Sequence, residues 1–322
     1  MKKMKKIRIA IVAALSVFAM GLVFHLNSIE TITAFSGIDV PLNTAKNSGA
    51  LTAQSTVLTN VASGRDVNRN ARGEIDFSNA NDGYVMARWL VPSATDIRVV
   101  IIGPNGTQYQ YRLSTAGDWE SFPLTGGNGS YTVRIAEAVG DGRFSVTNNV
   151  NIDLVLRNEF APFLRPNQFV NFNAQSTAVS LARMLTAVAT SDLDSVSRVY
   201  NWVVDNITYD FDLAQNVQSG YVPDLEAVLE RRRGICFDYA SLMTAMLRSQ
   251  GIPTRLAIGY VGDVRHAWIS VFTREHGWVN DLIQFDGNDW RLMDPTFSAT
   301  GGSVEAARFV GTGGNHRQTH LH

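Results

Sequence analysis

The chain lacks the features that mark several large classes of protein. It has one cysteine in 322 residues, so it cannot form an internal disulfide, and zinc sites built from several cysteines are excluded. Its formal net charge is -1, and it therefore lacks the basic surplus that is typical of nucleic-acid-binding proteins. Hydrophobic residues make up 45% and charged residues 18%, which is the composition of a globular protein with a sizeable core. The length predicts roughly two domains.

The N-terminal segment predicts export from the cytoplasm. Basic side chains cluster between Lys2 and Arg8, and the run Ile9–Leu26 then contains no Asp, Glu, Lys or Arg. A basic segment followed by an apolar one is the pattern of a secretory signal. The run is also just long enough for a membrane-spanning helix. Residues 1–26 are therefore expected to be a signal peptide or a membrane anchor, and the remaining chain to be secreted or attached outside the cytoplasmic membrane.

A polar stretch and a β-rich region follow. Residues 27–73 are rich in Asn, Ser, Thr and Ala without a sustained hydrophobic period, and we expect a linker there. Residues 74–157 contain short β-branched or alternating runs, such as Ile97–Ile102, separated by Gly-rich turns. Short strands at near-regular spacing are typical of a β-sandwich. The region carries no paired carboxylates or histidines, so we expect an accessory module.

Residues 158–300 predict an α+β domain. The segment Phe160–Pro166 has two prolines and is expected to form an extended connection. Helical periodicity then indicates four helices, which are expected at Thr177–Ala189, from Asp192 onward with Asp192 as N-cap, around Leu225–Leu229, and from Cys236 to about Gln250. Strands are expected afterwards at Leu256–Val261, His266–Phe272 and Trp290–Asp294, with an additional strand at Trp278–Phe285. Residues 301–322 are expected to form a flexible, exposed tail, or a weak metal-binding tail because they contain histidines.

Cys236 lies where a catalytic nucleophile is expected. It begins a predicted helix in which residues 240, 243 and 247 are apolar and share its face. The free N–H groups and partial positive charge of a helix N-terminus stabilise a thiolate and are expected to lower the thiol pKa. The thiolate is the attacking species in thiol catalysis. Taken alone, however, a single cysteine at a helix start is more often structural.

His266 and Asp294 can complete a catalytic triad with this thiol. His266 begins one predicted strand and Asp294 ends another. If these strands pair antiparallel, the imidazole and the carboxylate become neighbours. The carboxylate can then hold one imidazole nitrogen while the other nitrogen faces the thiol.

Four short motifs follow one another between residues 234 and 296. They are Gly234-Ile235-Cys236-Phe237-Asp238-Tyr239-Ala240, Gly251-Ile252-Pro253-Thr254-Arg255, His266-Ala267-Trp268 and Asp294-Pro295-Thr296. In this order and spacing they resemble the core of the transglutaminase-like superfamily, and Asn206-Ile207-Thr208-Tyr209-Asp210 resembles the segment that precedes this core. The resemblance covers about residues 175–300. It implies a papain-like fold in which Cys236 is the nucleophile, His266 the base and Asp294 the residue that orients the base.

The resemblance further implies a reaction class. Some family members use an aromatic residue upstream of the cysteine to stabilise the oxyanion, and Tyr221 resembles it, although a core or loop position is equally compatible. The implied reaction is acyl transfer on protein or peptide amides through a Cys236 thioester, without a metal or cofactor. Hydrolysis, as by a cysteine protease or amidase, is favoured by analogy. Crosslinking by a protein-glutamine γ-glutamyltransferase and a non-catalytic extracellular binding module stay open as alternatives.

Overall fold

A computed structural model describes residues 57–261, 264–285, 290–292 and 316–322 of the chain. The described residues contain two hydrophobic cores, one among β-strands and one among helices and a second group of strands, as the predicted α+β fold class requires. The expected export segment, residues 1–26, lies outside the described residues. Within the part of the chain that is described, no helix is long and apolar enough to span a bilayer.

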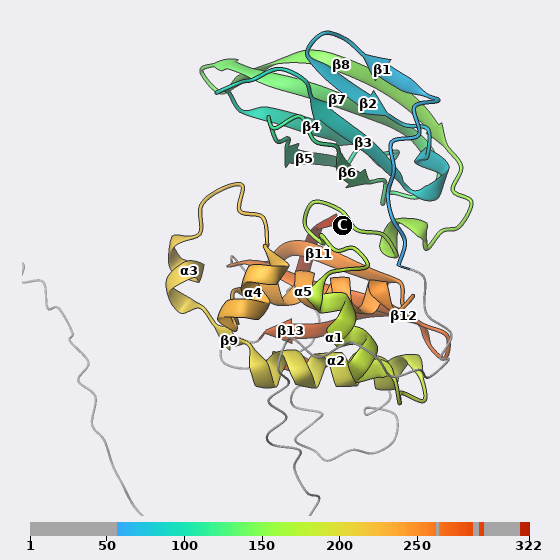
Figure 1. Ribbon diagram of the computed structural model, residues 1–322, viewed down its shortest axis with the longest axis vertical. Coiled ribbons are helices and arrows are strands. Elements are labelled where there is room, and N and C mark those ends of the chain that lie inside the picture. Colours follow the sequence, from blue (N-terminus) through green and yellow to red (C-terminus); the bar gives the residue numbers. More distant parts are fainter. Residues whose placement is uncertain (1–56, 262–263, 286–289, 293–315) are drawn as a thin grey trace, which may run out of the picture. The chain divides into compact units, whose positions relative to one another are not determined.

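The N-terminal region consists of two antiparallel four-stranded sheets (Figure 1). The first sheet has the order β1 (Val67–Arg69), β2 (Gly73–Asp76), β3 (Tyr84–Trp89), β6 (Glu120–Pro123). The second has the order β5 (Gln108–Arg112), β4 (Ile97–Ile102), β7 (Gly129–Gly140), β8 (Arg143–Leu154). Side chains alternate between buried and half-buried along β4, as expected when one face of a strand meets the core. Both sheets contribute to one core, which confirms the predicted β-sandwich.

The first sheet begins earlier than the sequence pattern predicts. β1 and the start of β2 lie within residues 27–73, which we expected to be a linker. The β1 sequence Val-Asn-Arg has no apolar alternation, and the strand is positioned by main-chain pairing with β2. Periodicity of side chains therefore gave no signal for it, because backbone hydrogen bonds are independent of side-chain polarity.

The helical layer contains the four predicted helices in order, together with a short helix at Phe211–Asn216 that the sequence pattern did not indicate. Its helices are α1 (Thr177–Thr186), α2 (Asp192–Asn206), α3 (Phe211–Asn216), α4 (Leu225–Arg231) and α5 (Cys236–Ser249). The N-cap of α2 is Ser191 rather than Asp192, and its side chain accepts a hydrogen bond from the Asp194 N–H. Every residue from Asp238 to Ser249 is buried, because α5 packs against α1 and α2 on one side and against strands on another.

The strands that contact α5 belong to a five-stranded antiparallel sheet. Its order is β14 (Trp290–Leu292), β13 (Gly277–Phe285), β12 (Val264–Thr273), β11 (Thr254–Val261), β15 (His316–Leu321). The additional strand expected at Trp278–Phe285 is present as β13, and it lies between β12 and β14. The His266 strand therefore does not pair directly with the Trp290 strand, which was the condition considered from the sequence. Both pair with β13, so they run parallel to each other.

The end of the chain is part of this sheet rather than an exposed tail. β15 pairs with β11, and His322 is 4% exposed. At Gly259 a side chain would collide with the Arg317 carbonyl oxygen and with Trp268, so glycine permits the close approach of β15. The β15 residues are all polar except Leu321, and composition alone therefore did not indicate a strand.

The His322 ring fills an aromatic site between the two cores. Its Nδ1 lies 2.9 Å from the Tyr111 hydroxyl, and its ring packs edge-on against Phe169 at 4.8 Å between centroids. The Arg248 guanidinium donates to the carbonyl oxygens of His322 and Thr254, at 2.6 and 2.9 Å. Burial lowers the pKa of Arg248 to about 9 and lowers the pKa of His322 well below its ordinary value.

The connection between the two regions also differs from the expectation. Ala161–Phe163 forms a short 3-10 helix, η2, in place of an extended segment. Pro162 lies in the first turn, where a missing N–H costs nothing because the first N–H groups of a helix have no intrahelical partner. The Phe160 ring packs on Phe272 of β12 at 4.4 Å between centroids, which anchors the connection to the sheet.

Candidate active site

The helix that begins at Cys236 is capped by its own third residue, Asp238. The Ile235 N–H donates to Asp238 Oδ2 at 2.8 Å, which satisfies an N–H group that the helix leaves unpaired. A side chain at Gly234 would place its Cβ 2.7 Å from the Asp238 Cβ, so glycine is needed for this tight entry. The motif Gly-Ile-Cys-Phe-Asp thus fixes the cysteine in the first turn, as predicted.

The structure brings the Cys236 thiol to the strand that carries His266. α5 packs on β12, and the main-chain N–H of Ala267 donates to the Cys236 sulfur. Ala267 follows His266 directly, so the thiol lies beside the histidine's own stretch of backbone. His266 is 8% exposed, and its ring stacks near Trp268 at 6.3 Å between centroids. The nucleophile and the base expected from the sequence are therefore neighbours in the fold.

The thiol pKa differs from the expectation. Burial raises the pKa of Cys236 above its ordinary value, and the Asp238 carboxylate raises it further. The N–H groups of Ala267, Phe237 and Cys236 itself oppose this shift without reversing it. The prediction that the helix start lowers the thiol pKa considered only the helix, whereas desolvation by the packed sheet is the larger effect. A raised thiol pKa favours the protonated form, so a base is needed to remove its proton.

Tyr209 contacts the thiol, and sequence reasoning did not assign it a role. The short strands β9 (Thr208–Tyr209) and β10 (Arg233–Gly234) pair in parallel, which places Tyr209 opposite Gly234. The Cys236 N–H donates to the Tyr209 hydroxyl, and the hydroxyl also interacts with the sulfur. Burial raises the pKa of Tyr209 to about 12, with the neighbouring thiolate as a further cause, so its hydroxyl is protonated at physiological pH. In the sequence, Asn206–Asp210 resembles the segment that precedes the family core, but nothing in it indicates a contact with the thiol.

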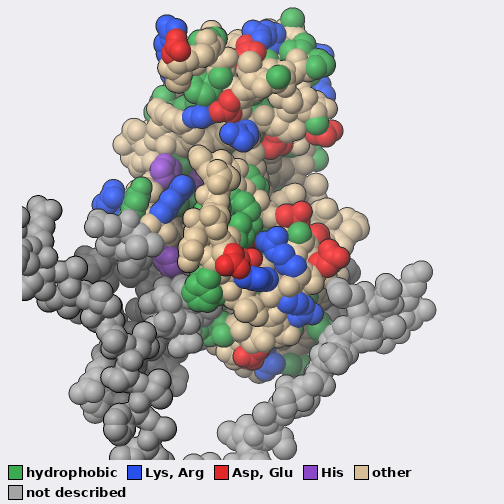
Figure 2. Space-filling model, turned by 90° about the vertical axis from the view of Figure 1, so that its left-hand side faces the viewer, with side chains coloured by type: hydrophobic (Ala, Val, Ile, Leu, Met, Phe, Trp, Pro, Cys, Tyr) green, Lys and Arg blue, Asp and Glu red, His purple; other side chains and the backbone are tan. Residues whose placement is uncertain are grey.

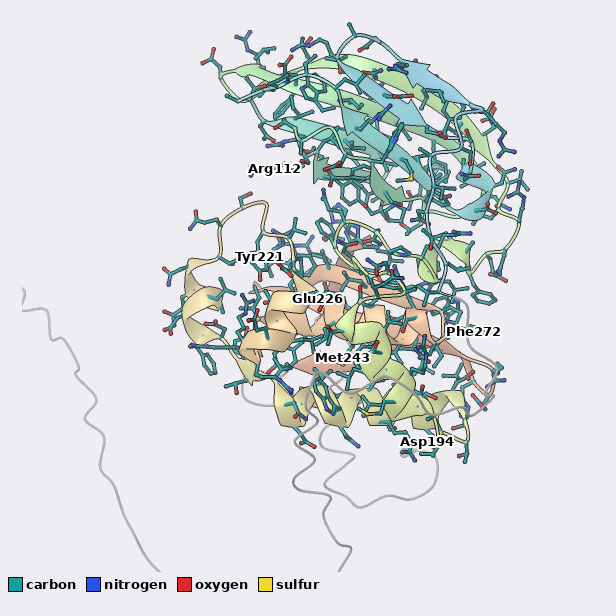
Figure 3. All side chains as sticks on the ribbon, in the orientation of Figure 1. Arg112, Asp194, Tyr221, Glu226, Met243 and Phe272 are labelled. Carbon is teal, nitrogen blue, oxygen red and sulfur yellow. The ribbon has the colours of Figure 1, made fainter. Side chains whose placement is uncertain are left out.

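Tyr221 lies elsewhere in the site. It follows α3 in the chain (Figure 3), and its hydroxyl donates to Asp238 Oδ1 at 2.7 Å. Arg231 lies 3.8 Å from the other Asp238 oxygen. Burial nevertheless raises the pKa of Asp238, while the contacts with the Ile235 N–H, Tyr221 and Arg231 lower it. The structure thus places Tyr221 against the carboxylate that caps α5, and it places Tyr209 against the thiol.

Two other predictions concern Asp294 and the histidines near the end of the chain. Asp294, the expected orienting carboxylate, lies outside the described residues. Among the described residues there is no group of three or more His, Cys, Asp or Glu side chains suited to a metal.

Residues 179–295 match the transglutaminase-like superfamily, and the chain therefore contains a domain of that superfamily. The match begins in α1 and ends just after the Asp294 position, so it includes Cys236, His266 and Tyr209. It covers the helical layer and most of the sheet that form the site described above, and it excludes the β-sandwich.

A curated protein and several solved structures are similar to parts of the chain. An uncharacterised protein of Mycobacterium leprae (strain TN) is 40% identical over 70 residues, which is 21% of this chain and 24% of that protein. The chain thus spans about a quarter of that relative's length. Among solved structures, a provisionally assigned cysteine protease from Cytophaga hutchinsonii is 15% identical, covers 80% of this chain and 73% of its own, and has a TM-score of 0.36.

Two further structures are more distant. A provisionally assigned protease from Parabacteroides distasonis ATCC 8503 is 14% identical over 58% of this chain and 38% of its own, with a TM-score of 0.30. The transglutaminase of red sea bream is 13% identical over 66% of this chain and 48% of its own, with a TM-score of 0.26. At these identities and scores the likenesses do not bear on the activity of this chain.

Proposed function

We propose that the chain is a thiol acyltransferase that acts on protein or peptide amides, with Cys236 as the nucleophile and His266 as the base. One observation carries this proposal. The Ala267 N–H donates to the Cys236 sulfur, which holds the thiol beside His266, the residue before Ala267. A nucleophile within reach of a histidine is the common element of thiol catalysis. We keep Asp294 as the residue that orients the imidazole, on the strength of its motif.

The proposed reaction has two steps. His266 takes the proton of Cys236 as the sulfur attacks the amide carbonyl, and the carbon–nitrogen bond then breaks as His266 protonates the leaving amine. A thioester on Cys236 is left. Water next attacks this thioester with His266 as base, which releases the acid and restores the thiol.

The oxyanion of each tetrahedral intermediate needs hydrogen-bond donors. In the resting site the Tyr209 hydroxyl accepts from the Cys236 N–H and interacts with the sulfur, so an oxyanion that replaces these contacts can accept from both groups. The raised pKa of Tyr209 keeps its hydroxyl a donor across the physiological range. We therefore assign the oxyanion role to Tyr209 in place of Tyr221.

Hydrolysis is the outcome we propose, with a protein or peptide at the cell surface as substrate. The expected export segment, residues 1–26, is the basis for this location. Transfer of the acyl group to a lysine amine would use the same thiol, base and oxyanion donors. The acceptor alone separates these two reactions, so the products must be identified.

Mass spectrometry of the acyl-enzyme tests the proposal. The protein is mixed with a p-nitrophenyl ester, quenched in acid and digested, and the acyl group is expected on Cys236. Product analysis with a peptide amide, in the presence and absence of a free amine, then distinguishes hydrolysis from transfer. Cys236→Ala is expected to remain folded and to carry no acyl group. A wild-type protein that stays unmodified, or one modified only at other residues, would contradict the proposal.

A further inference from the structure

Phe211 is an aromatic side chain that the fold does not bury. Its relative exposure is 56%, and it is the only aromatic among the large hydrophobic side chains that are exposed in the described residues. Figure 2 shows the side of the molecule that carries α3, where hydrophobic side chains lie open to solvent among charged ones. An aromatic ring left in water forgoes most of the stabilisation that its burial would give.

The helix that begins at Phe211 has no core of its own. α3 contains no buried residue, although its start is firmly held. The Asp210 side chain accepts from the Leu213 N–H at 2.9 Å and caps the helix. Arg233 then lies 3.2 Å from Asp210 and 3.0 Å from Asp212, so it bridges both carboxylates of the first turn. The fold thus fixes the position of Phe211 while leaving its ring exposed.

The exposed ring lies next to the proposed reaction centre. Phe211 packs edge-on against Tyr209, with 4.9 Å between the ring centroids. The Tyr209 hydroxyl contacts the Cys236 sulfur. A single aromatic side chain therefore separates Phe211 from the nucleophile. An extended residue advances about 3.3 Å along a peptide, so a substrate bound at the thiol can reach the ring within a few residues of its reactive carbonyl.

We propose that Phe211 is a specificity-determining residue that binds an apolar, preferably aromatic, side chain of the peptide acyl donor. This inference rests on the function proposed above and adds the chemical class of the substrate. An apolar side chain seated on the ring removes both surfaces from water and can pack edge-on, as Tyr209 already does.

Acetyl-dipeptidyl chloromethyl ketones test the inference without a known substrate. The thiolate displaces chloride, and the ketone must first be bound at the site. One probe carries two phenylalanines and the other two serines, and the second-order rate constant for inactivation is measured for each. We expect the wild type to prefer the phenylalanine probe, and Phe211→Ala to reduce this preference about tenfold, which is ~1.4 kcal/mol. Phe211→Tyr keeps the ring and is expected to keep the preference.

Val188→Ala is the matched control. Val188 is also an exposed apolar residue, at 68%, but it lies between α1 and α2. Its substitution is expected to leave the preference unchanged, and circular dichroism verifies that each variant is folded. Iodoacetamide, which carries no side chain, reports on the thiol itself and is expected to react with Phe211→Ala within about twofold of the wild-type rate.

The outcomes separate the two proposals. If iodoacetamide and both ketones modify Cys236 but Phe211→Ala keeps the wild-type preference, the inference is overturned and the proposed function stands. The inference is equally overturned if the wild type shows no preference. If Cys236 reacts with none of the three reagents, the proposed function fails, and the inference that depends on it fails too.

Discussion

Replacing Tyr209 with phenylalanine tests the proposed oxyanion site most directly. The change removes one hydroxyl and keeps the ring that packs against Phe211. Loss of one oxyanion donor costs about 10²- to 10³-fold in rate, or ~2.7–4 kcal/mol. Tyr209 is half-buried rather than fully enclosed. Since water can replace part of the lost interaction at such a site, we expect the lower end of this range, about 10²-fold.

The assay compares two reactions of the same thiol. Acylation by a p-nitrophenyl ester passes through a tetrahedral oxyanion, whereas alkylation by iodoacetamide is a direct displacement without one. Tyr209→Phe should slow acylation about 10²-fold and alkylation only slightly. The acylation defect should be constant between about pH 6 and 9, because a Tyr209 pKa of about 12 keeps the hydroxyl protonated throughout.

Tyr84→Phe provides the control for this experiment. Its hydroxyl accepts from the Val61 N–H at 3.1 Å in the β-sandwich, so the same chemical change is made away from the thiol. Both rates are expected to match the wild type. An unchanged acylation rate in Tyr209→Phe, or an equal loss in both reactions, would refute the assignment. The first result would mean that the hydroxyl does not meet the oxyanion, and the second that it acts on the thiol alone.

Three further perturbations follow from the charges and contacts of the site. Asp238→Asn should shift the midpoint of Cys236 alkylation to lower pH, because the Asp238 carboxylate opposes thiolate formation; an upward shift would contradict this. His322→Gln should flatten the loss of thermal stability below about pH 6.5. The pKa of His322 is lowered in the folded state, so the unfolded state binds the extra proton and stability falls by up to ~1.4 kcal/mol per pH unit as the pH drops through this window. A melting temperature that declines equally in both proteins would argue against that origin. Asp294→Asn should reduce acylation by up to ~10⁴-fold with little change in melting temperature, and the reverse pattern would identify Asp294 as a turn residue.

The order and type of most of the longer secondary structure elements followed from local sequence. Helical spacing of apolar residues located four of the helices, and β-branched runs located most of the strands. Cys236 was assigned to a helix start because Gly234 and the following apolar positions define that boundary. These signals are local, since each depends on residues within one or two turns of the chain.

What each element packs against was decided by the tertiary structure. Parallel pairing of β9 with β10 brings Tyr209 to the thiol from 27 positions away, and neither segment is long enough to show a strand period. β13 lies between the strands of His266 and Trp290, and β15 gains its partner from β11 despite its polar composition. The direction of the Cys236 pKa shift reversed for the same reason. The helix dipole can be inferred from sequence, whereas desolvation depends on the sheet that covers the helix, which only the folded chain supplies.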